Sequence, residues 1–220
     1  SPVFFTPSGE CLWPASTQMN WDGNAEQGMQ SIVMRSPDNG KTWPSWNAVM
    51  DGRSDGISHW EIKFVDLRDG RLLAVCWTHD SKTGADLPIH YALSSDEGRT
   101  FSSPASTGLR GQTCTPLVLN DGQILSVYRR SDRPGLWAQI STLDGETWVN
   151  HGEELLWGGV SHASGPKDPK FATTTMSTLR FGLPTSVLLH DGTVLVAFWC
   201  VEDAVSVIRY FKIDVQNESH

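Results

Sequence analysis

The sequence predicts an all-β protein built from a repeated four-stranded unit, the arrangement of a β-propeller. Three observations support this prediction. Asp-Gly turns recur between apolar runs, a second turn motif follows them, and the 20 Gly and 12 Pro residues are spread along the whole chain. The ten Trp and eight Phe side chains suit the packing of stacked sheets better than that of long helices.

Pairs of apolar runs joined by an Asp-Gly turn mark the first two strands of each unit. Three such pairs occupy residues 61–77, 115–128 and 185–199, around Asp69, Asp121 and Asp191. Asp-Gly between β-rich runs is a strong hairpin signal, because Gly accepts a positive φ. A weaker copy opens the chain, with a turn at 7–9. We therefore expect four hairpins.

A second motif, Ser-x-Asp-x-Gly-x-Thr followed by an aromatic residue, comes after the hairpins. Its two complete copies are Ser36, Asp38, Gly40 and Trp43, then Ser94, Asp96, Gly98 and Phe101. A degenerate copy has Ser141, Gly145 and Trp148, with Leu143 at the Asp position. In such a turn Asp caps backbone N–H groups, Gly takes the left-handed conformation and the aromatic ring packs on the sheet. We interpret the three copies as structural turns without a ligand.

Each unit reads as inner strand, Asp-Gly turn, second strand, loop, third strand, second turn and fourth strand. Units of about 50 residues with four short strands are typical of propeller blades. We expect a single domain over 1–220, with blades at about 1–50, 56–106, 112–156 and 182–220. Residues 158–178 lack periodicity and are expected to form a long loop or an inserted segment.

Charge and composition exclude several classes of function. The formal net charge is −8, from 17 basic and 25 acidic residues, and no Lys/Arg run exists, so nucleic-acid binding is not expected. No apolar run approaches the roughly 18 residues of a membrane span. The N-terminus has no basic region followed by a long apolar core, which favours a cytoplasmic protein, with a removed signal peptide as the alternative.

Neither the cysteines nor the histidines have the spacing of a metal site. Cys11, Cys76, Cys114 and Cys200 lie far apart inside apolar runs, which indicates buried free thiols, with a disulfide as the alternative. The seven histidines are scattered. We therefore expect no metal and no cofactor, and a structural Ca²⁺ has no support in the sequence.

The turns and hairpins together resemble the Asp-box (neuraminidase-repeat) proteins of the sialidase superfamily, and more narrowly bacterial sialidase-family proteins of uncharacterised activity. The closer resemblance is carried by 59–62 (His-Trp-Glu-Ile), 87–94, 108–116, 127–131 (Val-Tyr-Arg-Arg-Ser), 134–137 and 198–203. It covers nearly the whole chain and implies six blades, whereas the sequence has signals for four, most similar to the last four. Either two blades are absent or four close alone. Open edge strands are then expected to be covered by ring closure or by self-association.

Strand direction predicts where a site would lie. If the Asp-Gly turns are at one end of the blades, the inner strands start, and the second strands end, at the other. That end collects Trp60, Glu61, Arg110, Gln112, Arg129, Arg130 and Arg180. Arg binds carboxylates bidentately, and aromatic faces pack against sugar rings. We predict a carbohydrate site there, in which Glu61 is catalytic and the other six residues bind substrate.

These residues also have structural interpretations. A carboxylate at the start of an inner strand usually needs an Arg partner, so we expect Glu61 within hydrogen-bonding reach of Arg110 or Arg129. Arg110 precedes a Gly and is equally compatible with a solvated loop. Arg129 and Arg130 alternate in direction along a strand, so one of them is expected to face the channel and the other a neighbouring blade.

The sialidase resemblance implies a Tyr nucleophile, a Glu that assists it and carboxylate-binding Arg residues. Glu61 falls where the assisting Glu would lie, but Phe181, near the Tyr position, has no hydroxyl, and Trp77 replaces an Arg. The Phe-Arg-Ile-Pro motif and the loop with the acid/base Asp are missing. Sialidase activity itself is therefore not expected. The sequence predicts a sialidase-like glycoside hydrolase scaffold that binds a sugar, and the alternative is a non-catalytic Asp-box propeller that binds glycan or protein.

Overall fold

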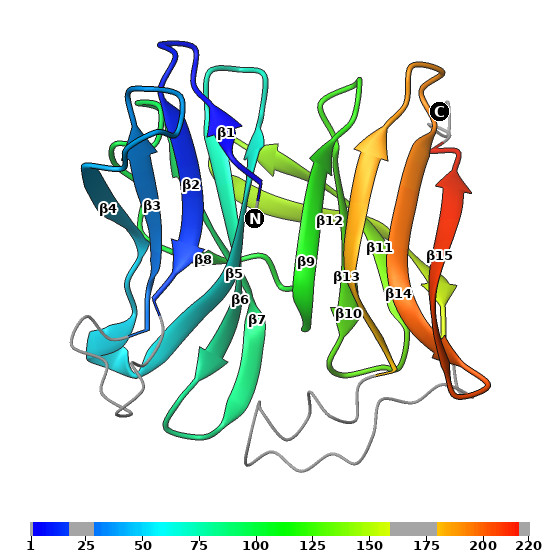
Figure 1. The fold of residues 1–220 in the computed structure, drawn as a ribbon. Helices are drawn as coiled ribbons and strands as arrows, with labels where there is room; N and C mark the ends of the chain where they lie inside the picture. The colour runs from blue at the N-terminus through cyan, green and yellow to red at the C-terminus, as the bar shows by residue number, and fades with distance from the viewer. Residues whose placement is uncertain (1, 18–28, 159–179, 216–220) are drawn as a thin grey trace.

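The computed structural model describes residues 2–17, 29–158 and 180–215, which form four antiparallel sheets in chain order (Figure 1). The first sheet consists of β1 (Phe4–Phe5), β2 (Cys11–Ser16), β3 (Ser31–Ser36) and β4 (Ser45–Met50). The second consists of β5 (Ile57–Asp66), β6 (Leu72–Asp80), β7 (Ala85–Ser94) and β8 (Ala105–Ser106). The third consists of β9 (Gly111–Val118), β10 (Ile124–Arg130), β11 (Leu136–Asp144) and β12 (Thr147–Trp157). The fourth consists of β13 (Phe181–Leu188), β14 (Val194–Glu202) and β15 (Val205–Ile213).

The strands of each sheet are hydrogen-bonded in chain order, so each sheet is an up-and-down meander that resembles a propeller blade. The first strands of successive sheets contact one another, β5 with β9 and β9 with β13, which places them on the inside. The predicted all-β class is confirmed: across the described part of the chain, helix is limited to a 3₁₀ turn at Arg53–Asp55. No described helix is long and apolar enough to cross a membrane.

The three Asp-Gly turns form the predicted hairpins. They join β5 to β6, β9 to β10 and β13 to β14 at one end of the molecule, the upper end in Figure 1. In each turn the Asp carboxylate accepts a hydrogen bond from the backbone N–H two residues later, as Asp121 does from Gln123 at 3.0 Å. Gly122, for example, has a φ of 85°, in the left-handed region that Gly enters without steric cost.

The two complete Ser-x-Asp-x-Gly-x-Thr turns, between β3 and β4 and between β7 and β8, share one hydrogen-bond pattern. Asp38 accepts hydrogen bonds from the backbone N–H and the hydroxyl of Thr42 at 2.8 and 2.7 Å, and Ser36 accepts one from the N–H of Gly40 at 2.8 Å. The second turn repeats these bonds with Ser94, Asp96, Gly98 and Thr100. The hydrogen bonds from Thr42 lower the pKa of Asp38 to about 2.

We expect these turns to make the fold sensitive to acid. The carboxyl groups of Asp38 and Asp96 have a pKa of about 2 in the fold, below the ordinary value of 3.8. A lowered pKa stabilises the fold above the ordinary value, and this stabilisation is lost as the pH falls from about 4 to about 2. The double variant Asp38→Asn/Asp96→Asn should therefore have a lower Tm at pH 7 and a shallower fall of Tm in acid, measured by circular dichroism. Identical Tm–pH curves for the variant and the wild type would contradict this expectation.

The degenerate third copy folds into a different turn, so its interpretation as another copy of the same turn is wrong. β11 and β12 pair down to a two-residue loop that begins at Gly145. Ser141 hydrogen-bonds to Asn150 across the hairpin at 2.9 Å. Leu143 lies directly opposite Trp148 in the ladder, where it cannot accept N–H groups as a carboxylate would. In the two complete copies the chain leaves its strand at this point, whereas here the pairing of β11 with β12 continues.

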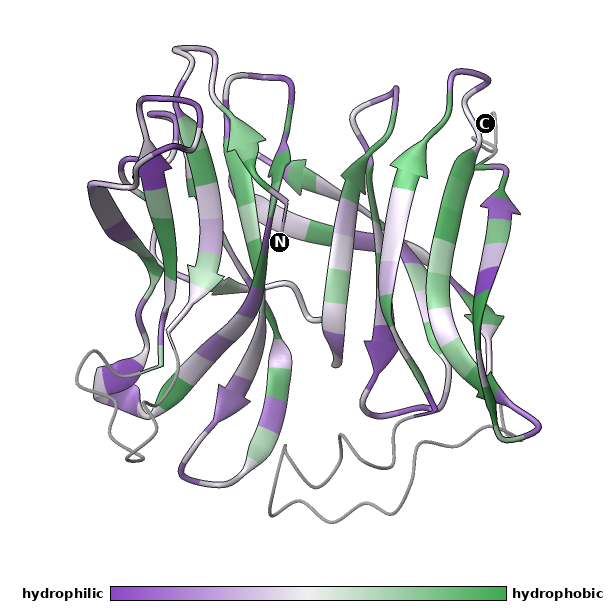
Figure 2. Ribbon diagram, viewed as in Figure 1, coloured by the Kyte–Doolittle hydropathy of each residue, from purple (hydrophilic) through white to green (hydrophobic). Residues whose placement is uncertain are grey.

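Alternation along the second strands divides the core into three layers, one between each pair of successive sheets. In β6, Leu72 and Ala74 pack toward the first sheet, whereas Leu73 and Val75 pack toward the third. Figure 2 shows this apolar character along the strands and hydrophilic residues in the turns. All four cysteines are free and buried, as the sequence predicted.

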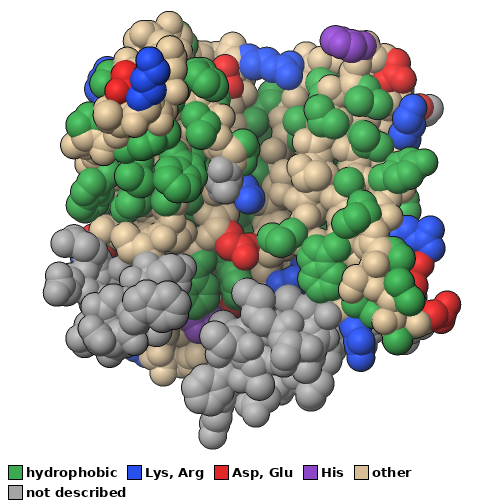
Figure 3. Space-filling view, in the orientation of Figure 1, with side chains coloured by type: hydrophobic (Ala, Val, Ile, Leu, Met, Phe, Trp, Pro, Cys, Tyr) green, Lys and Arg blue, Asp and Glu red, His purple; other side chains and the backbone are tan. Residues whose placement is uncertain are grey.

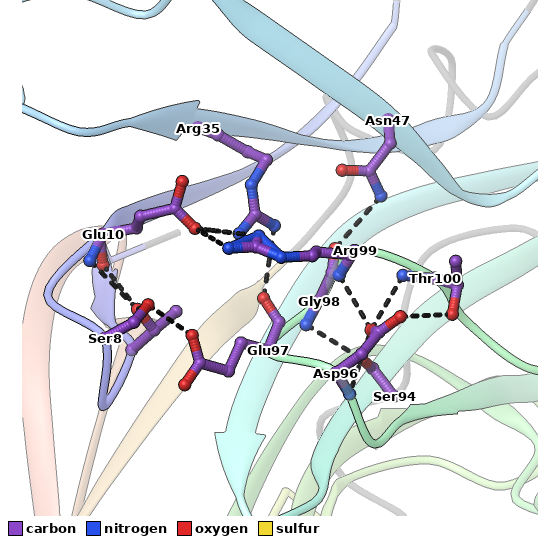
Figure 4. A network of polar contacts seen from close by, with 11 residues as sticks. Ser8, Glu10, Arg35, Asn47, Ser94, Asp96, Glu97, Gly98, Arg99 and Thr100 are labelled. Carbon is purple, nitrogen blue, oxygen red and sulfur yellow. Dashed lines mark hydrogen bonds and ion pairs between the residues drawn. The ribbon is translucent and has the colours of Figure 1, made fainter.

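A polar network ties the first sheet to the second at the end that carries the turns (Figure 4). Glu10, before β2, is ion-paired with Arg35 of β3 and with Arg99 of the turn after β7. Arg35 also donates to the carbonyl oxygen of Glu97 at 3.2 Å, and the Glu97 carboxylate accepts a hydrogen bond from Ser8. The turn after β7 therefore holds two sheets together.

Candidate functional site

The candidate site lies at the end opposite the Asp-Gly turns, the lower end in Figure 1. Five segments meet there: the starts of β5, β7 and β9 and the ends of β6 and β10. Four of the seven predicted site residues belong to a connected cluster at this end, Trp60, Glu61, Gln112 and Arg129. Antiparallel meanders place them together because every inner strand starts where every second strand ends.

The inner strands of the last three sheets each have a bulge at the same place. The pairing register with the second strand shifts once in β5, once in β9 and once in β13. At each shift one residue has a positive φ: 51° at Glu61, 53° at Thr113 and 47° at Leu183. Such a backbone costs about 1–3 kcal/mol for a non-Gly residue, and bulges near active sites re-aim side chains. None of the three is Gly, so the sequence carries no local signal for this feature.

Glu61 presents a carboxyl group with little water around it. The side chain is partly buried, and its Oε2 is fully buried without a hydrogen bond from any described residue. Burial raises the pKa of Glu61 above the ordinary 4.5, while the charges of Arg129 and Lys63 act in the opposite direction. The group therefore keeps its proton to a higher pH than a solvated Glu does, which suits a general acid.

Arg129 is the buried cation of the site, with 4% of its surface exposed. Its guanidinium donates to Gln112 Oε1 through Nε at 3.1 Å and also through Nη2, and to the carbonyl oxygen of Phe181 through Nη1 at 3.2 Å. Gly182 makes room for it, since a Cβ there would lie 2.7 Å from Nη1. Burial lowers the pKa of Arg129, and the attraction of neighbouring carboxylates opposes that shift.

Asp86, at the start of β7, was missed by the sequence reasoning and joins the second sheet to the third. Its Oδ1 accepts a hydrogen bond from Trp77 Nε1 at 2.7 Å and lies 3.2 Å from His79 Nδ1. Its Oδ2 accepts a hydrogen bond from Gln112 Nε2. Because Gln112 in turn holds Arg129, Asp86 positions the cation through one intermediate. Its partners come from two other strands, so no local motif marks it.

Trp60, the residue before Glu61 in β5, forms an aromatic cluster with Trp77 and His79. Its ring stacks on His79 with centroids 5.1 Å apart and 21° between the planes, and meets Trp77 edge-on at 5.1 Å. Trp60 Nε1 is buried and has no hydrogen-bond partner among the described residues. A fixed indole with an unpartnered N–H is a feature that suits a hydroxylated ring.

The other three predicted site residues lie outside this cluster. Arg130 is ion-paired with Asp132 and Glu153, so carboxylates of its own sheet already occupy its guanidinium. Arg110 and Arg180 are exposed beside the starts of β9 and β13. Of the two adjacent arginines, Arg129 reaches the neighbouring fourth sheet through Phe181, whereas Arg130 pairs within its own sheet and not with a neighbouring blade as was expected for one of them.

The expected hydrogen bond between Glu61 and an Arg is not formed, and this expectation is wrong. Arg129 influences the Glu61 carboxyl as a nearby charge but directs its donors to Gln112 and Phe181. Gln112 competes successfully because it lies directly opposite Arg129 in the β9–β10 ladder. Among the described residues, Glu61 Oε2 is thereby left without a hydrogen-bond partner.

No group of three or more His, Cys, Asp or Glu side chains in the described residues is arranged to hold a metal ion. His59 and His90 contact each other, with Nε2 and Nδ1 3.2 Å apart. Burial, and then repulsion by His90, lowers the pKa of His59 to about 4. His59 is therefore neutral at physiological pH.

Asp86→Asn should weaken the support of the buried cation. The Asn amide has one oxygen and therefore cannot accept hydrogen bonds where both Asp86 oxygens do, so either Gln112 or Trp77 loses its acceptor. We expect the free energy of unfolding to fall by about 1–3 kcal/mol, measured by urea denaturation. Asp55→Asn, in the exposed 3₁₀ turn, is the matched control and should change it by less than about 0.5 kcal/mol. Equal effects of the two substitutions would contradict the positioning role of Asp86.

Comparison with known proteins relates the fold to a class. No protein-family model matches the chain, and no curated protein matches it in sequence. A Dyadobacter fermentans protein of unknown function matches its structure with a TM-score of 0.66 at 21% identity, over 94% of this chain and 50% of that chain. The Hadza microbial sialidase Hz136 matches with a TM-score of 0.63 at 14% identity, over 95% and 43%. A GH43 β-1,3-galactosidase matches with a TM-score of 0.59 at 9% identity, over 97% and 44%.

These matches concern the fold alone, because the identities are low. The chain spans half or less of the length of each of the three matched chains. The fold is therefore that of part of a β-propeller of the kind found in glycosidases such as sialidases and GH43 enzymes.

Proposed function

We propose that the chain forms part of a glycoside hydrolase and binds a sugar at the end of the sheets where the inner strands begin. The observation that supports this proposal is the Glu61 carboxyl, held on a strained bulge with Oε2 buried and unpartnered, within the influence of the Arg129 charge. Buried polar groups are normally hydrogen-bonded, and exceptions cluster where ligands bind. The fold class provides the second line of support.

The proposed roles follow from charge and placement. Glu61 donates its proton to the glycosidic oxygen as the bond between that oxygen and the anomeric carbon breaks, and its raised pKa keeps that proton available. A water molecule adds to the anomeric carbon, and the proton that it releases restores the acid form of Glu61. The Trp60 indole packs against the sugar, while the hydrogen-bonded pair of Gln112 and Arg129 forms the polar side of the site. Arg110 and Arg180, exposed at the same end, would contact outer parts of the substrate.

Sialidase chemistry is not part of the proposal. Phe181 is buried, has no hydroxyl, and offers only its backbone carbonyl to Arg129. A Tyr nucleophile is therefore not available at this position.

A screen tests the proposal directly. The protein is incubated with aryl β-galactoside, α-arabinofuranoside, β-fructofuranoside and α-sialoside, and release of the aryl group is followed together with Trp fluorescence. Turnover of at least one neutral glycoside, with fluorescence quenching by the free sugar, is the expected result. Absence of both turnover and quenching across the panel would reject the proposal.

A non-catalytic glycan-binding or protein-binding propeller is the second candidate. One observation favours it: glycoside cleavage ordinarily uses two carboxyl groups, and both oxygens of Asp86 are already hydrogen-bonded. In the described residues of the cluster, Glu61 is then the single carboxyl group with an unpartnered oxygen. Fluorescence quenching by a sugar without any turnover would favour this candidate.

A further inference from the structure

Thr113, at the bulge of β9, combines a strained backbone with a buried hydroxyl group that has no hydrogen-bond partner. The residue is 5% exposed, and its Oγ1 is buried without a partner in the described part of the chain. Its φ of 53° is in the left-handed region, which a β-branched residue rarely adopts. An unpaired buried hydroxyl and a strained backbone each cost stability, and such costs gather at functional sites.

The bulge itself does not require this hydroxyl. Leu183 has the equivalent place in β13, with a φ of 47°, and its side chain is a hydrocarbon. Thr115, two residues further along β9, uses its hydroxyl within the fold and donates to the carbonyl oxygen of Pro184 at 2.6 Å. The Thr113 hydroxyl therefore neither forms the bulge nor joins the described sheets.

Thr113 occupies the position in β9 that Glu61 occupies in β5. Each lies in the register shift between a first and a second strand, and β5 contacts β9. Arg129 connects the two bulges, because its guanidinium is hydrogen-bonded to Gln112, the residue before Thr113, and its charge acts on the Glu61 carboxyl. Two neighbouring strands thus each present, at equivalent positions, a buried oxygen without a partner among the described residues.

The chain around Thr113 is fixed before any ligand binds. Gln112 is held from both ends, since its amide donates to Asp86 and its oxygen accepts from Arg129. Figure 3 shows the molecule from the side on which β9 lies in front, and the surface there is hollowed between the two halves, with acidic and basic side chains among hydrophobic ones. Binding groups that are held in place in this way lose little entropy when a ligand binds.

We propose that Thr113 is a substrate-binding residue whose hydroxyl hydrogen-bonds a hydroxyl group of the same neutral sugar whose glycosidic oxygen Glu61 protonates. This role rests on the proposed function and names the group of the substrate that is recognised. A sugar hydroxyl matches Thr113 because each both donates and accepts, and, unlike a charged group, it is buried at little cost once it is hydrogen-bonded. The Thr113 hydroxyl is covered in the present conformation, and rotation about the Cα–Cβ bond, which exchanges it with the methyl group, would present it to the sugar.

Stability provides the first test. Thr113→Val keeps the branched shape and removes only the unpaired hydroxyl, so Tm should stay the same or rise. Thr107→Val is the matched control: Thr107 is 3% exposed, but its hydroxyl donates to the carbonyl oxygen of Ile89 at 2.8 Å and accepts from the N–H of Leu109 at 3.1 Å. This control should lower Tm by at least about 2–4 °C. An equal loss of Tm in Thr113→Val would show that the hydroxyl is structural and overturn the proposed role.

Sugar binding provides the second test. Galactose, arabinose and fructose are titrated with Trp fluorescence as the signal, and the sugar that the wild type binds is then replaced by its monodeoxy analogues. Thr113→Val should raise the dissociation constant about tenfold, whereas Thr113→Ser, which keeps the hydroxyl, should raise it less than about threefold. One monodeoxy analogue should bind the wild type about tenfold more weakly than the parent sugar does, but should bind Thr113→Val as well as the parent sugar, because it lacks the hydroxyl that Thr113 contacts.

The outcomes distinguish this role from the proposed function. Equal affinity of the wild type and Thr113→Val for the sugar would overturn the role of Thr113 alone and would indicate that an ordered water molecule pairs with its hydroxyl. A loss of affinity in Thr113→Val that is the same for the parent sugar and for every monodeoxy analogue would also overturn it. Sugar binding without turnover, with the expected effect of Thr113→Val, would reject catalysis by Glu61 and support the contact with Thr113. A wild type that neither binds nor cleaves any of these sugars would reject the proposed function and the role of Thr113 together.

Discussion

Glu61→Gln should lower turnover of any aryl glycoside that the wild type cleaves by about 10²–10⁴-fold, the usual contribution of a general acid. Gln has nearly the same shape but carries no transferable proton. Because burial raises the pKa of Glu61, wild-type turnover should also fall as the pH rises through that pKa, and the Gln variant should lose this dependence. The measurement is kcat/KM between pH 4 and pH 9.

Stability separates this catalytic role from a structural one. Glu61 makes no hydrogen bond with Oε2, so its replacement should shift Tm by no more than a few degrees. Glu154→Gln, at an exposed position on β12, is the control and should preserve both turnover and Tm. A Glu61→Gln variant that retains wild-type turnover and its pH profile would remove Glu61 from the chemistry.

Gly111→Ala should destabilise the fold and disturb the site together. A Cβ at Gly111 would lie 2.5 Å from the carbonyl oxygen of Arg129 and 2.4 Å from the Tyr128 ring. One of these neighbours is backbone, so a side-chain rotation cannot relieve the clash, and β9 must move away from β10. We expect a loss of about 1–3 kcal/mol in the free energy of unfolding, the usual range for overpacking.

The control for this substitution is Gly152→Ala in β12. No atom lies within 4 Å of the Cβ position there, and its φ is not in the left-handed region. The added methyl group should change stability by less than about 0.5 kcal/mol in urea denaturation. Sugar binding should weaken in Gly111→Ala only, because Gln112 and Arg129 follow in the same ladder. Equal stability of the two variants would contradict the packing argument.

Features encoded by neighbouring residues were predictable from the sequence. The hairpins at Asp69, Asp121 and Asp191 depend on Asp-Gly pairs between alternating runs, and all of them form. The place of Glu61 and Arg129 at one end follows from strand direction alone. The prediction for the third turn was wrong for a reason visible in the sequence: Leu143 has no oxygen that could accept hydrogen bonds from backbone N–H groups, as the Asp carboxylate does in the other two turns.

The site itself depends on contacts between strands that are distant in the sequence. Gln112 takes the hydrogen bonds that Glu61 was expected to receive, because it lies opposite Arg129 in the ladder. Asp86 enters only because β7 starts beside β6 and β9. The bulge at Glu61 comes from the register between two strands, and no residue type announces it.

The repeated bulge separates the backbone shape of the candidate site from the chemistry of its side chains. Glu61, Thr113 and Leu183 adopt the same backbone in three successive sheets, yet they present an acid, a hydroxyl and a hydrocarbon. The register between the first and second strands sets the backbone conformation of the bulge, so the side chain at this position can change without changing that conformation. A single codon change at any of the three positions can install a new functional group in a ready-made orientation, without rebuilding a strand. A propeller of this kind offers several equivalent bulge positions to natural or laboratory selection, and the present sequence has an acid at one of them, Glu61.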